Sequence, residues 1–386
     1  MKRNQRKRGL FLEPYWAGSH AYFGQALQGG SSIDWSFQTL PGNHWKWRMR
    51  EAPLLFSARL QESAASQADI LLASSYVPLA ELYGLGPMEL RRLPSVLYFH
   101  ENQLTYPISP KTPGGKDFHY GFTQAVSARA ASLCVFNSAY NRASFLEELQ
   151  KLLARLPSPK PKNLVSSIEA KSRVLGVPLD LPSPLPPPTS PSPSSSGAAD
   201  GPLIAWPHRW ESDKNPEAFF EALQALEQNG LPFRVLVCGG SAIHSEMSRS
   251  FQEWRQRWKE KIVHWGFVED RREYLSLLAA SHIAVSTARH EFFGVALMEA
   301  AAMGCYPLVP DDLSYRELYP ESHRYKTQDD LVERLASLCT AWQRGALPAR
   351  SAHQEIAAPY LSATLIPCYD ALFDELLERR GPPASR

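Results

Sequence analysis

The sequence predicts two α/β domains, each built on a doubly wound parallel sheet. Short apolar segments alternate with amphipathic segments on both sides of residues 178–202, which is a pattern typical of βαβ units. Residues 178–202 are rich in proline and serine and offer almost nothing to a core, so we expect an extended tether there. The length of 386 residues fits this division, because it exceeds what one hydrophobic core usually supports.

Strands are expected where short apolar runs are flanked by polar residues. In the first domain, residues 9–177, the candidate strands are 9–13, 70–74, 96–99 and 134–137. In the second domain, residues 203–357, they are 203–206, 235–238, 263–265, 282–286 and 306–309. A basic arm, residues 1–8, precedes the first domain, and its simplest interpretation is a solubilising tail. Residues 358–386 contain a closing helix, which we expect to pack back on the first domain.

Bulk composition excludes several classes of protein. The chain is 44% hydrophobic and 21% charged, which is typical of a globular protein, and its formal charge of +2 excludes a polycation. An RNA or other anionic partner would therefore be met by a local patch. No apolar run approaches the roughly 18 residues of a membrane span, and the apolar segment after the basic arm is too short for a signal peptide. Five scattered cysteines without a C-x-x-C motif favour a reducing compartment, the cytoplasm: Cys134, Cys238, Cys305, Cys339 and Cys368.

The most informative functional pattern is the segment EFFGVALME, in which Glu291 and Glu299 lie eight positions apart. The segment follows the predicted strand 282–286, so we expect Glu291 at the carboxyl end of a strand and Glu299 about two turns into the next helix. Open α/β sheets bind ligands at that edge, and a helix N-terminus there favours anions. Gly294 would let the backbone come close to a ligand. The arrangement suits a diphosphate with a hydroxyl-rich group at each end, although two unrelated surface glutamates would give the same spacing.

A second charged motif, WPHRWESDKNPEAFF, follows the strand that opens the second domain. It places Arg209 and Lys214 on one loop, where two cations could clamp a diphosphate, the arginine by its planar fork and the lysine as a point charge. The alternative is a pair of solvated charges beside Glu211 and Asp213. In one sheet, this loop and the loop of Glu291 would open on the same edge, which favours the functional interpretation.

These residues resemble a known family, the tRNA-queuosine α-mannosyltransferases, which are family 4-like retaining glycosyltransferases of GT-B fold. The resemblance rests on motifs that occur in order along the chain: EPYWAGSHAYF, HWKWRMR, LYFHENQLTYP, DFHYGFTQ, VFNSAYN, WPHRWESDKNPE, HWGF and ARHEFFGVALMEA. It covers nearly the whole chain except the basic arm and the tether. It implies two Rossmann-like domains facing a central cleft. It also implies transfer of mannose from GDP-mannose, with retention, to the cyclopentenediol of queuosine in tRNA-Asp.

The resemblance also assigns roles to residues of the donor site. Arg209 and Lys214 would hold the diphosphate and stabilise the leaving nucleotide, whereas Glu291 would meet the sugar hydroxyls and Glu299 the ribose. Backbone N–H groups at the helix start would complete an anion cradle. Further donor contacts are expected from Gly18, Ser19, His20, Phe292, Phe293 and Gly294. The residues expected to act in catalysis are Arg209, Lys214, Glu291 and His100.

The acceptor side is expected in the first domain. His100 follows a predicted strand in FHEN, where the superfamily has a histidine lining the cleft, and a core histidine bonded to backbone is the alternative. The segment HWKWRMR interleaves cations with aromatics, which suits stacking on bases and contact with phosphates. Two buried tryptophans between solvated basic residues would give the same pattern. The expected RNA contacts are His44, Trp45, Lys46, Trp47, Arg48, Arg50, Glu101 and Asn102, with Lys111, Lys116 and the basic arm extending the track.

Nothing in the sequence fixes the two carboxylates about 5 Å apart that double displacement would need. We therefore expect front-face displacement, in which the departing phosphate oxygen helps to accept the acceptor proton. Without H-E-x-x-H, paired cysteines or D-x-D, we expect no essential metal and no cofactor besides the donor substrate. The alternatives are a same-fold transferase with a lipid, saccharide or small-molecule acceptor, and a non-catalytic nucleotide-sugar or RNA-binding module. Such a module would normally have lost a clamp cation or a carboxylate, and this chain keeps all four.

Overall fold

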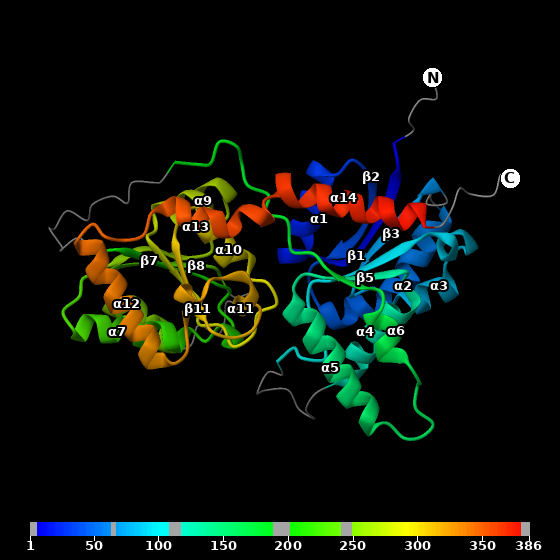
Figure 1. The fold of residues 1–386 in the computed structure, drawn as a ribbon, viewed down its shortest axis with the longest axis horizontal. Helices are drawn as coiled ribbons and strands as arrows, with labels where there is room; N and C mark the ends of the chain where they lie inside the picture. The colour runs from blue at the N-terminus through cyan, green and yellow to red at the C-terminus, as the bar shows by residue number, and fades with distance from the viewer. Residues whose placement is uncertain (1–5, 63–66, 108–116, 188–200, 241–248, 380–386) are drawn as a thin grey trace. The chain divides into compact units, whose positions relative to one another are not determined.

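The computed structural model describes residues 6–62, 67–107, 117–187, 201–240 and 249–379 (Figure 1). The chain divides into two compact units. The first unit comprises Met1–Asp180 and Tyr360–Arg386, and the second comprises Leu181–Pro359. The end of the chain therefore belongs to the first unit. Among the described helices, none is both long and apolar enough to cross a membrane.

The first unit is built on a parallel sheet of six described strands in the order β2-β1-β3-β4-β5-β6. The inner strands are buried along most of their length, as in parallel sheets that helices cover on both faces. The strand order reverses between β1 and β3, and ligands bind outside the carboxyl ends of strands at such a switch point. The strands are β1 (Arg8–Trp16), β2 (Asp34–Pro41), β3 (Ile70–Ser74), β4 (Ser95–Phe99), β5 (Leu133–Phe136) and β6 (Ser172–Val174).

Helices connect these strands in the alternation that the sequence predicted. Asp117 and Ser138 cap the starts of α4 and α5 by accepting hydrogen bonds from backbone N–H groups of the first turn. The helical segments are α1 (Gly18–Gly30), α2 (Trp45–Glu62), α3 (Leu79–Leu85), η2 (Met88–Arg92), α4 (Phe118–Ala130), α5 (Ala139–Arg155) and α6 (Leu164–Glu169).

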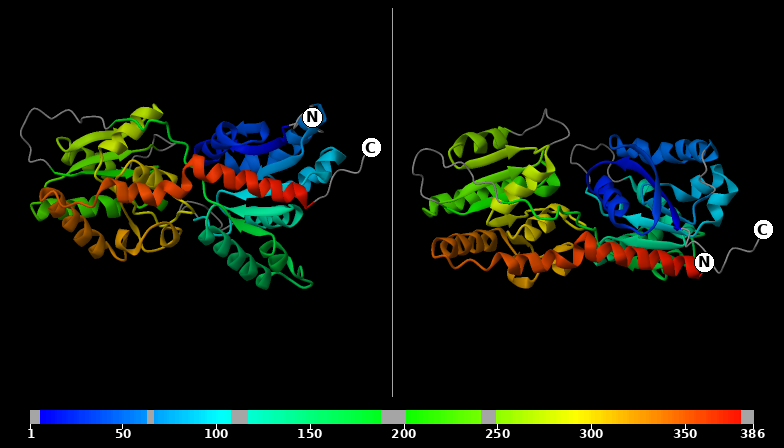
Figure 2. Two further views of the ribbon diagram at one scale, coloured as in Figure 1. Left: turned by 45° about the horizontal axis from the view of Figure 1, so that its top comes forward. Right: turned by 90° about the horizontal axis from the view of Figure 1, so that it is seen from above.

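The last helix, α14 (Ser362–Glu378), packs on the first unit and lies alongside α1 (Figures 1 and 2). Its apolar face shares one core cluster with strands β1, β3 and β4. Polar contacts also hold α14 against the residues that follow α1, because Asp370 accepts hydrogen bonds from Ser31 and Ser32. The residues of α14 buried in this cluster are Leu365, Ile366, Tyr369 and Phe373.

The second unit has a parallel sheet of six described strands in the order β12-β11-β10-β7-β8-β9. Here the order reverses between β7 and β10, which places a second switch point at the carboxyl ends of these two strands. The strands are β7 (Leu203–Pro207), β8 (Arg234–Cys238), β9 (Ile262–Gly266), β10 (Ile283–Val285), β11 (Tyr306–Pro310) and β12 (Arg324–Tyr325).

The core of the second unit is strongly aromatic, with Trp206, Phe219, Phe220 and Trp258 almost fully buried. Pro216 opens α7 at a position that tolerates the loss of its N–H group. The helical segments are η3 (Ser212–Lys214), α7 (Pro216–Gln228), α8 (Arg249–Arg257), α9 (Arg271–Ala280), α10 (Val295–Ala302), α11 (Tyr315–Leu318), η5 (Glu321–His323), α12 (Gln328–Gln343), α13 (Arg350–Ala357) and η6 (Ala358–Tyr360).

The structure confirms the doubly wound α/β fold and differs from the sequence prediction at the edges. Strands β2, β6 and β12 were not predicted; the last two are only three and two residues long and carry no detectable pattern. Leu179, within the predicted tether, is buried and pairs with Leu361 of the first unit. Arg8, the last residue of the predicted arm, begins β1. Residues 1–5 and 188–200 lie outside the described part of the chain.

Candidate active site

Two polar clusters lie at the two switch points, one in each unit. In the second unit, the loop after β7 carries Arg209 and Lys214, and the loop after β10 carries Glu291. Hydrogen bonds join the two loops: the N–H group of Arg289 donates to the carbonyl of Asp213 at 2.7 Å, and the Thr287 hydroxyl donates to the carbonyl of Lys214 at 2.9 Å. The structure thus brings together the two motifs that the sequence placed at one edge of a sheet.

Lys214 is the buried cation of this cluster, with a relative exposure of 6%. Its Nζ donates to the carbonyl of His290 at 2.8 Å and lies 3.2 Å from Oε2 of Glu291 and 3.1 Å from Oδ2 of Asp213. Burial alone would lower the pKa of Lys214, but the two carboxylates raise it above its ordinary value. Burial would likewise raise the pKa of Glu291, but the ammonium of Lys214 lowers it to about 2. Both groups are therefore charged at neutral pH.

The backbone after Glu291 turns sharply into α10. Gly294 precedes this helix with a φ of +83°, a left-handed conformation that favours glycine. A Cβ there would also stand 3.3 Å from the ring of Tyr315 and 3.4 Å from Cγ of Glu291. The side chains of Phe292 and Phe293 are buried, so only their backbone groups could contact a donor. In this structure the N–H group of Phe292 lies 3.2 Å from Oε1 of Glu291.

Arg209 has a different environment from Lys214. Its side chain is 60% exposed, and its guanidinium lies 3.3 Å from Oε1 of Glu211. The preceding His208 is buried, and its Nε2 has no hydrogen-bond partner within the described residues. Burial, together with the nearby ammonium of Lys214, lowers the pKa of His208 to about 3. His208 is thus a neutral histidine beside the lysine, and no sequence pattern had indicated it.

Glu299 lies in α10, where it is almost fully buried and forms an ion pair with Arg271 at the start of α9. Glu299, which was expected to contact the ribose, therefore pairs with Arg271, a residue that was not predicted from the sequence. The only available signal was the charged pair Arg271-Arg272 at the beginning of a predicted amphipathic segment, and such pairs are common on surfaces.

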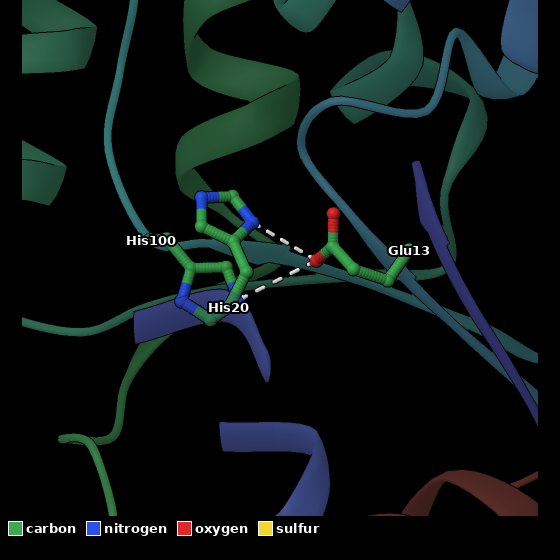
Figure 3. A group of neighbouring side chains, drawn as sticks. All are labelled: Glu13, His20 and His100. Atoms are coloured by element: carbon green, nitrogen blue, oxygen red, sulfur yellow. Dashed lines mark hydrogen bonds and ion pairs between the residues drawn. The ribbon is translucent and has the colours of Figure 1, made fainter. Parts of the chain in front are cut away.

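In the first unit, His20 and His100 meet around a buried carboxylate, Glu13 (Figure 3). Oε2 of Glu13 lies 2.9 Å from Nδ1 of His20 and 3.9 Å from Nε2 of His100. The two imidazole rings stack with centroids 4.0 Å apart. Burial, and then the neighbouring His20, hold the pKa of His100 well below its ordinary value. Gly18 and Ser19 are exposed at the start of α1.

The residues that follow His100 have two different environments. The carboxylate of Glu101 accepts hydrogen bonds from the Tyr76 hydroxyl and from Nε2 of Gln103. Asn102 is fully buried, and its amide donates to Oδ1 of Asn141 at 2.9 Å while its Oδ1 accepts from Thr105. The polar atoms of Asn102 are thus satisfied within the loop that they hold, and its contact with RNA stays a prediction.

The tryptophan-rich segment forms the first turns of α2, where its residues divide into two groups. Trp47 is 64% exposed, and the cations of Lys46 and Arg50 lie 5.9 and 5.2 Å from the ring of Tyr120 on α4. Lys46 also lies over the ring of Trp45, at 5.6 Å.

Arg48 instead binds the chain itself. It donates to the carbonyl of Pro41 and to Asn43, and it pairs with Glu51. The guanidinium of Arg48 thus holds the preceding loop in this structure, and its contact with RNA stays a prediction. His44 is exposed and precedes α2 with a φ of +51°. Lys111 and Lys116 lie outside the described residues, as do Lys2 and Arg3.

Comparison with known proteins identifies the family. Residues 8–179 match the family profile "tRNA-queuosine alpha-mannosyltransferase N-terminal", and residues 192–342 match "Glycosyl transferases group 1". A tRNA-queuosine alpha-mannosyltransferase from Drosophila melanogaster is 37% identical over 333 residues, which cover 86% of each chain. This chain belongs to the tRNA-queuosine alpha-mannosyltransferase family. It is a glycosyltransferase, as the sequence resemblance implied.

Three further proteins are similar to this chain, one over part of its sequence and two in fold. A GDP-mannose-dependent phosphatidylinositol dimannoside mannosyltransferase from Mycobacterium tuberculosis is 28% identical over 102 residues, 26% of this chain and 25% of that protein. Among solved structures, HepE from Anabaena in complex with UDP and glucose has a TM-score of 0.64 at 17% identity, covering 96% of this chain and all of that one. Sucrose-phosphate synthase from Thermosynechococcus elongatus has a TM-score of 0.67 at 15% identity, covering 97% of this chain and all of the other. The fold is GT-B, as predicted.

Glu13 was not predicted as a functional residue, although the motif around it was noted. The signal was a single acidic residue at the end of an otherwise apolar strand, in GLFLEP. A charged side chain almost never lies inside a buried strand unless it is paired. Glu13 is paired in this way, because it contacts Tyr15, Ser74 and His20. No rule based on sequence spacing would have brought these residues together.

Proposed function

We propose that this glycosyltransferase moves mannose from GDP-mannose, with retention of configuration, to the cyclopentenediol of queuosine in tRNA-Asp. The observation that carries the proposal is the likeness to the Drosophila enzyme, which extends over most of both chains. The likeness to the mycobacterial enzyme, named as GDP-mannose-dependent, supports the donor. Five free cysteines support action in the reducing cytoplasm.

In this proposal the donor diphosphate binds at the switch point of the second unit. Lys214 lies between the carboxylates of Glu291 and Asp213, which balance its ammonium. Arg209, on the same loop, adds a cation at the exposed edge, where it could approach a phosphate from solvent. Backbone N–H groups at the start of α10 would add further donors to the anion.

The transfer would proceed on one face of the sugar. The acceptor oxygen forms its bond to the anomeric carbon as the bond from that carbon to the phosphate oxygen breaks. The departing phosphate oxygen keeps the electron pair of the broken bond. It takes the proton of the acceptor hydroxyl, and GDP leaves. Arg209 and Lys214 would stabilise the negative charge that grows on the phosphate, an effect worth about 3 kcal/mol for one well-placed donor.

The acceptor tRNA would contact the exposed group on α2 and α4. Trp47 offers a ring that a base can stack on, and Lys46 and Arg50 offer cations for phosphates, with Tyr120 beneath them. This assignment leaves Arg48 and Asn102 out of the RNA surface, since both are used within the protein.

The decisive experiment incubates the protein with GDP-mannose and queuosine-containing tRNA-Asp, and then weighs the digested nucleosides. A gain of one hexose on queuosine is expected, with none on tRNA that carries guanine at that position. UDP-glucose and GDP-glucose serve as control donors, and phosphatidylinositol mannosides as control acceptors. Transfer to the lipid alone would favour the alternative transferase. Binding of both substrates without transfer would favour a non-catalytic module.

A further inference from the structure

The switch point of the first unit contains a buried carboxylate to which the proposed transfer assigns no role. Glu13 is 0% exposed in the carboxyl-terminal half of β1. Its Oε1 accepts the N–H group of Tyr15 at 2.9 Å and the hydroxyl of Ser74 at 3.0 Å, whereas its Oε2 faces Nδ1 of His20 at 2.9 Å (Figure 3). The two oxygens thus face two donors, the Tyr15 N–H group and the Ser74 hydroxyl, and one ring nitrogen of His20 whose role depends on the tautomer.

The short contact between Glu13 and His20 links the tautomer of His20 to the carboxylate. If Oε2 of Glu13 only accepts, the contact of 2.9 Å requires that Nδ1 of His20 carry the proton. A neutral imidazole has one donor and one acceptor nitrogen, so Nε2 of His20 is then the acceptor. His20 lies in the first turn of α1, at the sheet edge where doubly wound folds bind ligands.

His100 supports this arrangement without sharing the carboxylate. Its Nε2 lies 3.9 Å from Oε2 of Glu13, which is too long for a hydrogen bond. Its ring stacks on that of His20 at an interplanar angle of 27°. Because burial and His20 hold its pKa well below the ordinary value, His100 remains neutral and adds no charge that would compete for Glu13.

The same three side chains are also a ligand set that Zn²⁺ accepts, and their ligand atoms lie within 4.8 Å of one another. Two features favour the hydrogen bond over a metal. Oε2 of Glu13 and Nδ1 of His20 are already at hydrogen-bond distance. In addition, neither ring nitrogen of His100 has a hydrogen-bond partner among the described residues, so its second N–H lacks the acceptor that a metal-bound histidine usually has.

We propose that Glu13 is a positioning residue, which fixes the tautomer of His20 so that its Nε2 accepts a hydrogen bond from a substrate hydroxyl group. The inference rests on the proposed function, in which both the sugar and the cyclopentenediol carry hydroxyls. Glu13 would act through His20 and would not touch the substrate itself.

Glu13→Gln tests this role because it should reverse the tautomer. The N–H group of Tyr15 can only donate, so the oxygen of the new amide takes the place of Oε1 and its NH₂ group takes the place of Oε2. The NH₂ group then faces Nδ1 of His20, which must accept, and the proton of His20 moves to Nε2. Side-chain ¹⁵N NMR of histidine-labelled protein distinguishes the two tautomers, and His20→Gln identifies the signals of His20.

We expect the His20 signals to change from the Nδ1–H to the Nε2–H pattern in Glu13→Gln, with kcat about 100-fold lower and a nearly unchanged KM for the donor. Ser74→Ala is the matched control: it removes a donor from Oε1 but leaves Oε2 facing His20, so the tautomer and most of kcat should persist. Thermal unfolding of each variant verifies that the fold is intact.

Three results would overturn the inference: an unchanged tautomer in Glu13→Gln, a reversed tautomer with full kcat, or stoichiometric binding of added Zn²⁺ through both histidines. If the wild-type protein transfers no mannose, the proposed function fails and the link to catalysis fails with it. The NMR comparison still decides whether Glu13 fixes the tautomer, so the two failures are distinguishable.

Discussion

Lys214 and Arg209 share one loop, but their surroundings give them different tasks. Lys214 is buried between two carboxylates and also donates to the carbonyl of His290, so it joins the loops after β7 and β10. Arg209 is mostly exposed, and the side chain of Glu211 that it faces is partly exposed as well. The first residue therefore affects both folding and chemistry, whereas the second affects mainly the charge that meets the donor.

We predict that Lys214→Met lowers the free energy of unfolding by about 3 kcal/mol, because Glu291 and Asp213 are then left without the ammonium between them. Arg209→Ala should change stability by less than about 0.5 kcal/mol but lower kcat/KM about 100-fold. Denaturant unfolding and steady-state kinetics measure the two effects. Comparable destabilisation of both variants would contradict this division of roles.

The stability that Glu291 and Lys214 contribute depends on pH in a way that follows from the directions of their pKa shifts. The lowered pKa of Glu291 means that its stabilising contribution is present above the unfolded-state value and is lost as pH falls towards about 2. The raised pKa of Lys214 means that its contribution persists until pH rises through that higher value. The charge of the pair should thus stay constant through the neutral range.

The sequence allowed part of this site to be predicted, for a physical reason. Arg209, Lys214 and Glu291 follow predicted strands, and the edge at which such loops meet is a property of parallel sheets. The internal uses of Arg48 and Asn102 could not be predicted, because they depend on where the loops around Asn43 and Asn141 lie. Local pattern identifies the residue types at an edge, but it does not show which partners will satisfy them.

At the scale of elements, α2 presents one set of cations outwards and uses another to hold its own start. Lys46 and Arg50 contact the ring of Tyr120 on α4, so the two helices form one aromatic and basic surface. Arg48 lies between them in sequence but points to the loop before the helix, where it holds the carbonyl of Pro41 and the side chain of Asn43.

We predict that Lys46→Glu with Arg50→Glu weakens tRNA binding and flattens its salt dependence, by about one unit of slope for each phosphate that the protein no longer neutralises. Affinity for GDP-mannose should be unchanged. Arg48→Gln is the matched control, which should lower stability while the salt slope of tRNA binding stays as in the wild type. Filter binding across a range of salt concentrations measures the slopes. An unchanged slope in the double variant would remove this surface from the acceptor site.

At the scale of the whole molecule, two sheets of different strand order each have a polar cluster at the switch point. The alternation of short strands and helices made this architecture predictable. The short edge strands β6 and β12 were not, because so few residues carry no periodicity. The first unit also requires α14, whose Phe373 is fully buried against Trp35, with ring centroids 5.2 Å apart.

We predict that Phe373→Ala destabilises the first unit by about 3–5 kcal/mol, since it leaves a cavity among aromatic rings. Hydrogen exchange followed by mass spectrometry should show faster exchange in peptides from β1 and β3, with little change in β7 and β10. Cys368→Ser, on the exposed side of the same helix, is the control and should leave exchange unchanged. An equal decrease of protection in both units would contradict the division of the chain.

The place of α14 has a consequence for synthesis on the ribosome. Translation delivers the strands of the amino-terminal half first, but the helix that covers Phe23, Trp35 and Tyr98 is made after both sheets. Until α14 has been made, that apolar surface lacks this cover, whereas the intervening half can already close its own core. Nascent chains should therefore recruit chaperones at their earliest-made portion, and a premature stop codon shortly before residue 362 would leave an aggregation-prone product despite the presence of both sheets.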